Sequence, residues 1–172
     1  DMKLTIITVN YNDACGLKRT LQSVKEQTSR DFEYLVIDGG SQDGSKDLLD
    51  EYDEIITYSI SERDSGVFNA MNKGIGLAKG NYCLFLNAGD YFAANDVVEK
   101  VLPTLDDTDF ISGDTICISP SGKKALWKAP RILSVYVITR YSLSHQSTFI
   151  KTSLLKKRPY REDLRIASDW EQ

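Results

Sequence analysis

Two short apolar runs in this chain each end abruptly at or near a carboxylate. Residues 32–37 (FEYLVI) run into Asp38, and residues 82–86 (YCLFL) run into Asn87-Ala88-Gly89-Asp90. Near-continuous apolar runs of this length are typical of strands covered on both faces, as in a parallel sheet between helices. Ligands of open α/β sheets bind outside the carboxyl ends of the strands. The runs therefore predict a site at that edge for a polar, phosphorylated or metal-bound ligand; the alternative is that each Asp caps a following helix.

Strand-like and helix-like segments alternate through the first half of the chain. Strands are expected at residues 4–9, 32–37, 55–58 and 82–86. Between them, apolar positions recur at helical spacing around residues 17–24, 48–52 and 67–78, and Gly80 is expected to end the last helix. Such alternation with short links is typical of a doubly wound parallel sheet, whose crossovers are almost always right-handed. No G-x-G-x-x-G follows the first strand, so a dinucleotide-binding fold is not favoured.

The pattern changes from Phe110 onward. Residues 110–118 and 123–127 flank the turn Pro120-Ser121-Gly122 and predict an antiparallel hairpin. We therefore expect an α/β fold with a mostly parallel, Rossmann-like sheet flanked by helices and an added antiparallel portion.

Length and composition limit the function classes. A chain of 172 residues predicts one domain, and its net charge of -4 gives no general attraction to nucleic acid. Cys15, Cys83 and Cys117 are scattered without metal-ligand spacing, which favours a reducing compartment. No apolar run approaches the roughly 20 residues that span a bilayer, and the first residues do not resemble a signal peptide. We expect a cytosolic or peripheral protein.

Charge is distributed unevenly along the chain. Acidic residues dominate residues 43–54, and basic residues gather near the end of the sequence, at Lys151, Lys156, Lys157, Arg158, Arg161 and Arg165. The basic group is interpreted either as a solvated helix face or as a contact with an anionic membrane surface or a phosphate-bearing acceptor.

Four motifs occur in a characteristic order: residues 8–12 (TVNYN), 36–45 (VIDGGSQDGS), 64–74 (DSGVFNAMNKG) and 86–90 (LNAGD). The ordered set closely resembles the family 2 glycosyltransferases of the GT-A fold, which build bacterial capsule, lipopolysaccharide and exopolysaccharide chains. The resemblance covers essentially the whole chain, because residues 145–147 (HQS) and 167–169 (ASD) also fall where that family carries motifs.

The resemblance implies a single GT-A domain over residues 1–172. Residues 1–109 would form the nucleotide-sugar-binding half, and residues 110–172 would form an acceptor-side half that is incomplete at its C-terminus. The implied enzyme is a metal-dependent, inverting glycosyltransferase of cell-surface polysaccharide biosynthesis. It would move a sugar from a UDP-sugar to a hydroxyl of a glycan or a polyprenyl-diphosphate-linked acceptor. A cytoplasmic location, peripheral contact with the cytoplasmic face of the inner membrane and a homodimer are further expectations.

The resemblance also assigns residues to the nucleotide-sugar site. The expected contacts are Thr8, Val9, Asn10, Asn12, Asp38, Arg63, Asp64, Asn87, Ala88, Gly89 and His145. Asp38 could accept the imide N–H of uracil, a group that thymine shares and cytosine lacks, so UDP is favoured and dTDP stays open. Arg63 could neutralise the diphosphate, and Asp64 could bind ribose or sugar hydroxyls. Asp43 and Ser45 are expected to shape the following turn and helix.

Two carboxylates are expected to carry the chemistry. The family usually presents an acidic pair where this chain has only Asp90, which would hold Mg²⁺ or Mn²⁺ together with substrate phosphates and water. Asp169 matches the family's late acidic motif, whose Asp is the general base, and Glu171 is the alternative.

Two other functions remain open. A sugar-nucleotidyltransferase would share an α/β nucleotide-binding sheet, but a Gly-rich basic loop is expected after its first strand, and residues 10–13 (NYND) do not provide one. A non-catalytic nucleotide-sugar-binding paralogue is suggested by the missing second carboxylate near Asp90.

Overall fold

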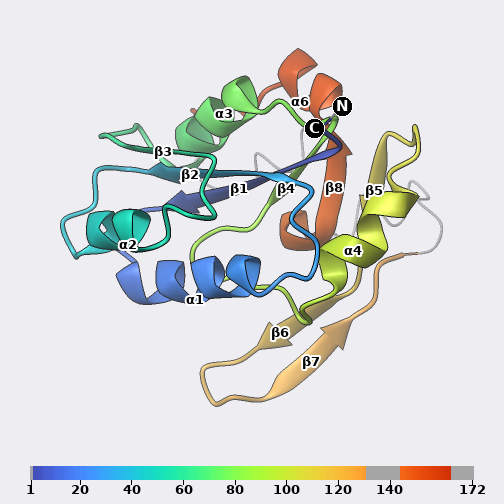
Figure 1. Ribbon diagram of the computed structural model, residues 1–172, viewed down its shortest axis with the longest axis horizontal. Coiled ribbons are helices and arrows are strands. Elements are labelled where there is room, and N and C mark those ends of the chain that lie inside the picture. Colours follow the sequence, from blue (N-terminus) through green and yellow to red (C-terminus); the bar gives the residue numbers. More distant parts are fainter. Residues whose placement is uncertain (1, 131–143, 164–172) are drawn as a thin grey trace.

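The computed structural model describes residues 2–130 and 144–163, which build a mixed sheet between two layers of helices (Figure 1). The parallel strands are β1 (Leu4–Asn10), β2 (Glu33–Asp38), β3 (Tyr58–Ser61) and β4 (Tyr82–Phe85). Strand β8 (Thr148–Lys151), which is antiparallel to both of its neighbours, and β5 (Phe110–Ser112) complete a six-stranded sheet in the order β3-β2-β1-β4-β8-β5. The expected fold class is confirmed.

Helices cover both faces of the sheet (Figure 1). One face packs against α1 (Ala14–Lys25), α2 (Ser45–Glu51) and α4 (Val97–Val101), which a 3₁₀ turn, η1 (Leu102–Thr104), extends. The other face packs against α3 (Val67–Leu77) and α6 (Thr152–Lys157). All seven residues of β1 are buried, as the near-continuous apolar sequence of a doubly covered central strand predicts.

Two glycines set the distance between α3 and the sheet. A Cβ on Gly74 would lie 2.6 Å from the Cγ2 atom of Ile7, so the helix approaches β1 through the missing side chain. A Cβ on Gly80, just after the helix, would lie 2.6 Å from the carbonyl carbon of Leu4. The tight packing holds the second half of α3 and the turn after it against β1.

Three expectations from the sequence were wrong. The third strand begins at Tyr58 rather than at Ile55, because Ile55 and Ile56 lie in the turns after α2 and pack against the core there. Residues 110–112 do not join the hairpin but pair with β8 in the main sheet; the separate hairpin consists of β6 (Thr115–Ile118) and β7 (Lys124–Trp127). Val67 begins α3 but is 43% exposed, so it does not belong to the buried face of that helix.

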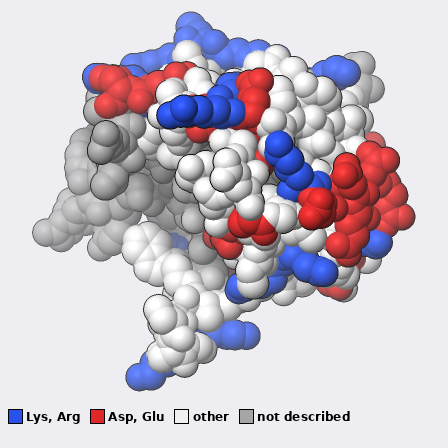
Figure 2. All heavy atoms as spheres, turned by 90° about the vertical axis from the view of Figure 1, so that its left-hand side faces the viewer, with Lys and Arg blue, Asp and Glu red and all other residues white. Residues whose placement is uncertain are grey.

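The charged segments lie on the surface. Exposed carboxylates of residues 43–53 surround α2, on the side of the molecule that Figure 2 faces, where acidic side chains gather at one edge. Several of the basic residues have protein partners: Lys151 pairs with Asp107, Arg161 pairs with Asp163, and Lys156 donates a hydrogen bond to the carbonyl of Ala78. Arg165 lies outside the described residues. Within the described part of the chain, no helix has the length and apolar character that crossing a bilayer requires.

Candidate nucleotide-sugar site

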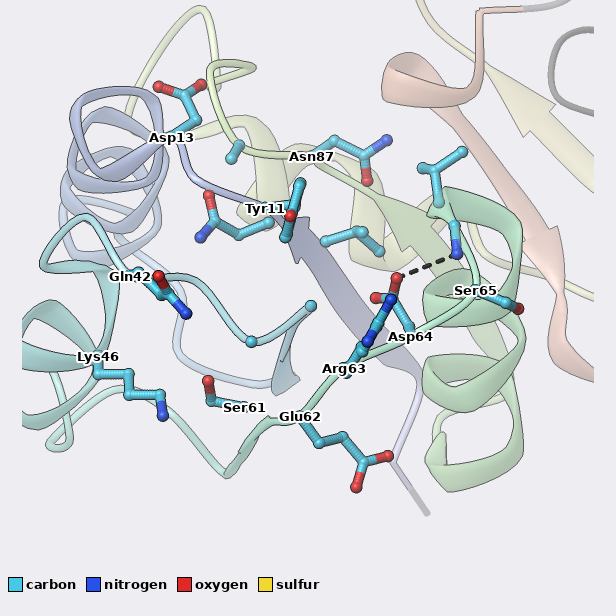
Figure 3. Close-up of a pocket in the computed structure, with 17 residues that line it drawn as sticks. Tyr11, Asp13, Gln42, Lys46, Ser61, Glu62, Arg63, Asp64, Ser65 and Asn87 are labelled. Carbon is cyan, nitrogen blue, oxygen red and sulfur yellow. Dashed lines mark hydrogen bonds between the residues drawn. The ribbon is translucent and has the colours of Figure 1, made fainter.

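An open cavity of about 1010 Å³ lies at the carboxyl ends of the parallel strands. Its walls come from the loop after β1, the loop after β2, the segment between β3 and α3, and the loop after β4 (Figure 3). In that view, Tyr11 and Asn87 lie on one side of the space, and Ser61 and Glu62 lie on the opposite side. This is the position at which open α/β sheets bind ligands, as the strand ends predicted.

Six of the residues expected from the sequence line this cavity: Val9, Asn10, Arg63, Asp64, Asn87 and Ala88. The other expected residues do not line it: Thr8, Asn12, Asp38, Gly89, Asp90 and His145. Asp169 and Glu171 lie outside the described residues.

Asp38 forms the centre of a buried hydrogen-bond network. Its side chain has no exposed surface, and it accepts five hydrogen bonds, from the Asn10 amide, the Gly40 and Ser41 backbone N–H groups, and the Ser41 and Ser61 hydroxyls. Burial alone would raise the pKa of this carboxyl, but the hydrogen bonds outweigh it and lower the pKa. The expected direct contact between Asp38 and the base is therefore not supported by this geometry, because its oxygens are already occupied by protein donors.

Other expected residues build the loops around Asp38. The Thr8 hydroxyl is buried and donates to the carbonyl of Leu86, which ties β1 to the end of β4. Asn12 has a positive φ of 49°; its N–H donates to the Ser41 hydroxyl, and its side-chain oxygen accepts from the Gln42 N–H. Both residues thus position the cavity walls.

Asp43 links the loops after β1 and β2. Its carboxylate accepts hydrogen bonds from the Ser45 hydroxyl and from the Ala14 N–H, at 2.6 and 2.7 Å. These bonds lower the pKa of Asp43, with the Ser45 hydroxyl as the largest cause. The expectation that Asp43 shapes the turn before α2 is confirmed.

Asp64 approaches the end of β2 through a gap that glycine leaves. One carboxylate oxygen, Oδ1, accepts a 3.1 Å hydrogen bond from the Gly66 N–H. The other, Oδ2, lies 2.9 Å from the position that a Cβ would take on Gly39. Gly40 has a φ of +82°, which glycine adopts readily, and a Cβ there would lie 3.2 Å from the backbone nitrogen of Arg63. The pair Gly39-Gly40 therefore lets the segment before α3 close over the end of β2.

The loop after β4 brings a carboxylate and an amide together. Gly89 has a φ of +96°, and its N–H donates to the Thr20 hydroxyl of α1, which in turn donates to the backbone carbonyl of Asp90. Burial raises the pKa of the Asp90 carboxyl, while the charge of His145 and a hydrogen bond from Gln146 act in the opposite direction. The buried side-chain oxygen of Asn87 has no hydrogen-bond partner among the described residues.

His145 reaches this loop from the far part of the sequence. It begins a 3₁₀ turn, η2 (His145–Ser147), directly before β8, which pairs with β4. Its Nε2 atom lies 3.4 Å from the Asn87 side-chain nitrogen. The two motifs are separated by 58 positions in sequence, and the antiparallel pairing of β8 with β4 makes them neighbours.

Oxygen ligands for a divalent cation are present in part. Asp90 and the unpartnered Asn87 oxygen belong to one loop, and carboxylate and amide oxygens suit Mg²⁺ or Mn²⁺. Among the described residues, no three His, Cys, Asp or Glu side chains form a complete ligand set. The residues therefore fit a metal only if substrate phosphates or water supply the remaining ligands.

Several cavity residues were not expected from the sequence. Tyr11, Asp13, Gly39, Gln42 and Lys46 lie in the same loops as the expected residues, and Ser61, Glu62, Ser65, Gly66 and Val67 flank Arg63 and Asp64. In the first group, Tyr11, Gly39 and Gln42 lie within the motifs TVNYN and DGGSQDGS, and Asp13 and Lys46 directly follow them, which was an available signal. The residues beside Arg63 could be recognised only once the packing of that segment over β2 was known.

Comparison with known proteins defines the class. The model of the family "Glycosyl transferase family 2" matches residues 5–162, so the chain belongs to this family of glycosyltransferases. An uncharacterized glycosyltransferase of Mycobacterium tuberculosis is 33% identical over 98% of the chain and 66% of its own length. A PGL/p-HBAD biosynthesis glycosyltransferase of Mycobacterium bovis is 31% identical over 97% of the chain and 66% of its length. The chain thus spans just under two thirds of these relatives.

Solved structures share the fold at low sequence identity. Residues 1–349 of TarS of Staphylococcus aureus, in complex with UDP-GlcNAc, superpose with a TM-score of 0.79 at 20% identity, over 98% of this chain and 51% of that fragment. The mannosyltransferase PcManGT of Pyrobaculum calidifontis, in complex with GDP-Man and Mn²⁺, superposes with a TM-score of 0.71 at 21% identity, over 97% of this chain and 50% of its own. Together with the family match, the shared fold of these structures confirms the expected GT-A type of fold.

Proposed function

We propose that this chain is the catalytic domain of an inverting glycosyltransferase that uses a UDP-sugar. The observation that carries the proposal is the cavity at the strand ends, where the motif loops of a family 2 glycosyltransferase meet. The UDP-GlcNAc complex of TarS supports a nucleotide-sugar as the ligand and favours UDP. The GDP-Man complex of PcManGT makes GDP the alternative to test.

The sugar donor would lie across the cavity from the loop after β2 to the loop after β4. Val9, Asn10 and Asp64 would face the nucleoside, and Arg63 would neutralise diphosphate charge. Asn87, Ala88 and Gly89 would lie against the diphosphate and sugar, since Gly89 lets the backbone approach closely. His145 would donate a hydrogen bond to the diphosphate or acceptor. Thr8, Asn12 and Asp38 would act by holding these loops in place.

A divalent cation, Mg²⁺ or Mn²⁺, is part of the proposal. Asp90, with the Asn87 oxygen of the same loop, would hold the ion together with the diphosphate. Bound there, the metal would neutralise the charge that develops on the departing diphosphate. The Mn²⁺ in the PcManGT complex supports a divalent ion in this fold.

Asp169 is the proposed general base. An acceptor hydroxyl must lose its proton as it attacks the anomeric carbon, and a carboxylate positioned to take it contributes about 10²–10⁴-fold. Direct displacement by the hydroxyl inverts the configuration at that carbon, so no covalent sugar–enzyme intermediate is required. Glu171 is the alternative base.

The acceptor is proposed to be a glycan or a polyprenyl-diphosphate-linked sugar. A Bacillus subtilis relative, 34% identical over 58% of the chain and 40% of its own length, is a putative teichuronic acid biosynthesis glycosyltransferase, TuaG. The M. bovis relative bears the name of PGL/p-HBAD biosynthesis. Both names support a role in cell-surface glycan or glycolipid assembly. A cytoplasmic location at the inner face of the membrane and a homodimer remain further parts of the proposal.

Thermal unfolding with nucleotides tests the donor site. UDP with Mn²⁺ should raise the melting temperature, because a ligand that binds only the folded state stabilises it by mass action. CDP and ATP at the same concentration are the controls. Stabilisation by ATP and not by UDP or GDP would contradict the proposal. UDP release from UDP-sugars, with and without acceptor, then separates an active transferase from a non-catalytic nucleotide-sugar-binding paralogue.

A further inference from the structure

We propose that Asp64, through the space left by Gly39, is the carboxylate that recognises the ring N–H of the sugar donor's base. The inference rests on the proposed function, because it names the part of the same site that selects the nucleotide. It assigns base selection to the segment before α3 rather than to the end of β2.

Asp38 lacks the capacity for this task. A carboxylate offers about four lone-pair positions, and Asp38 already accepts five hydrogen bonds from Asn10, Gly40, Ser41 and Ser61. Its side chain has no exposed surface and does not line the cavity. A base could reach it only if these bonds broke, which would leave buried donors without partners.

Asp64 has the capacity that Asp38 lacks. It lines the cavity and is half-buried. Oδ1 is held by the Gly66 N–H, and Oδ2 accepts no hydrogen bond from residues 2–130 or 144–163. The side chain is therefore fixed at one oxygen and available at the other. In Figure 3 it lies beside Arg63 at the wall of the open space, with the dashed line marking its anchored oxygen.

Gly39 determines where this oxygen lies. A Cβ at position 39 would meet Asp64 Oδ2 at 2.9 Å and the Cδ2 atom of the Tyr11 ring at 3.1 Å. Any other residue at position 39 would therefore push the carboxylate away from the end of β2. Since Gly39 has no positive φ, its backbone conformation is open to alanine, and the space is what requires glycine here.

The chemistry of a carboxylate restricts the bases that it can recognise. An ionised carboxylate only accepts hydrogen bonds. Uracil, thymine and guanine each present a ring N–H donor, whereas cytosine and adenine present a ring nitrogen acceptor at the corresponding position. Asp64 Oδ2 would thus favour UDP over CDP. The half-buried position strengthens this preference, because the carboxylate and the cytosine ring nitrogen are both acceptors and would lose their water without gaining a hydrogen bond.

Calorimetric titration of UDP, CDP and GDP into the wild-type protein and Asp64→Asn tests the assignment. Wild type should prefer UDP over CDP. Asp64→Asn should weaken UDP binding by at least about tenfold and reduce the UDP-to-CDP preference, because the amide can donate to cytosine. Asp50→Asn, on the exposed surface of α2, removes the same charge away from the cavity and should leave the preference unchanged. Preference for GDP over UDP would overturn the choice of uracil.

Gly39→Ala supplies an independent test. The added methyl group should displace Asp64 Oδ2 and reproduce the loss of UDP preference. Combining it with Asp64→Asn should add little further loss, since both changes remove one interaction. Unchanged UDP affinity in Asp64→Asn, or equal losses for UDP and CDP, would overturn the inference while leaving the proposed function intact. A wild-type protein that binds no nucleoside diphosphate would overturn both.

Discussion

Replacing Asp38 should destabilise the fold before it affects ligand binding. In Asp38→Ala, the backbone N–H groups of Gly40 and Ser41 lose their acceptor. The Asn10 amide loses one acceptor but still donates hydrogen bonds to the Ser41 and Ser45 hydroxyls. A buried donor left unsatisfied costs about 1–3 kcal/mol, and loss of a whole buried network costs roughly 3–5 kcal/mol. We expect the free energy of unfolding to fall by roughly 3–5 kcal/mol, against a typical domain stability of about 5–15 kcal/mol.

Asp38→Asn should cost less, about 1–2 kcal/mol. Its remaining oxygen can accept from Gly40 and Ser41, and its new amide nitrogen would then face Asn10. The Asn10 side-chain oxygen has no hydrogen-bond partner in the described part of the chain, so Asn10 can turn its amide over and accept that hydrogen. The predicted order of stability is wild type, then Asp38→Asn, then Asp38→Ala.

Urea unfolding from pH 3 to pH 8 measures both the order and its cause. The pKa of Asp38 is lowered in the fold, so its stabilisation is complete above its unfolded value of about 3.9 and is lost as pH falls through the lower folded value. The gap between wild type and Asp38→Asn should therefore be constant from pH 5 to 8 and shrink below about pH 4. An Asp38→Ala protein within about 1 kcal/mol of wild type that had lost UDP binding would refute this reasoning and make Asp38 a ligand contact.

Three further predictions concern the metal, the base and the packing of α3. Asp90→Asn should abolish the difference in UDP affinity between Mn²⁺ and metal-free buffer while leaving metal-free binding unchanged; a retained Mn²⁺ effect would exclude Asp90 as the ligand. Asp169→Asn should lower sugar transfer by about 10²–10⁴-fold with UDP binding retained, and transfer at the wild-type rate would move the assignment to Glu171. Gly74→Ala should cost about 1–3 kcal/mol in thermal unfolding because its Cβ meets Ile7, whereas Gly76→Ala, with nothing within 4 Å, should stabilise the same helix by up to about 1 kcal/mol; equal effects would contradict the packing argument.

The sequence was sufficient for the parallel half of the fold. The apolar runs of β1, β2 and β4 predicted the buried strands, because strands covered on both faces need little polar sequence. The third strand was displaced because Ile55 and Ile56, although apolar and β-branched, contact the core from a turn. Local propensity could not distinguish these two kinds of burial.

The antiparallel half depended on contacts between distant segments. Phe110–Ser112 continues directly toward Thr115–Ile118 in sequence, which favoured one hairpin. The structure instead pairs the first of these segments with β8, and only the second pairs with β7. The pairing of β8 with β4 also brings His145 next to Asn87. The motif at residues 145–147 could be recognised from the sequence, but its contact with Asn87 could not.

The two carboxylates Asp38 and Asp64 explain why motif position alone does not assign a role. Both lie at the strand-end edge, but Asp38 is the last residue of β2 and is surrounded by hydrogen-bond donors, whereas Asp64 approaches over Gly39 with one oxygen that accepts no hydrogen bond from the described residues. A carboxylate whose lone pairs are filled contributes to folding, and one with an open lone pair can contribute to selection of a ligand. The activity measured for an Asp38 variant must therefore be divided by the fraction of protein that is folded. Only a loss that persists after this correction indicates a role in ligand binding or catalysis. For Asp64, where removing one anchoring hydrogen bond leaves the core intact, loss of UDP affinity reports on the ligand directly.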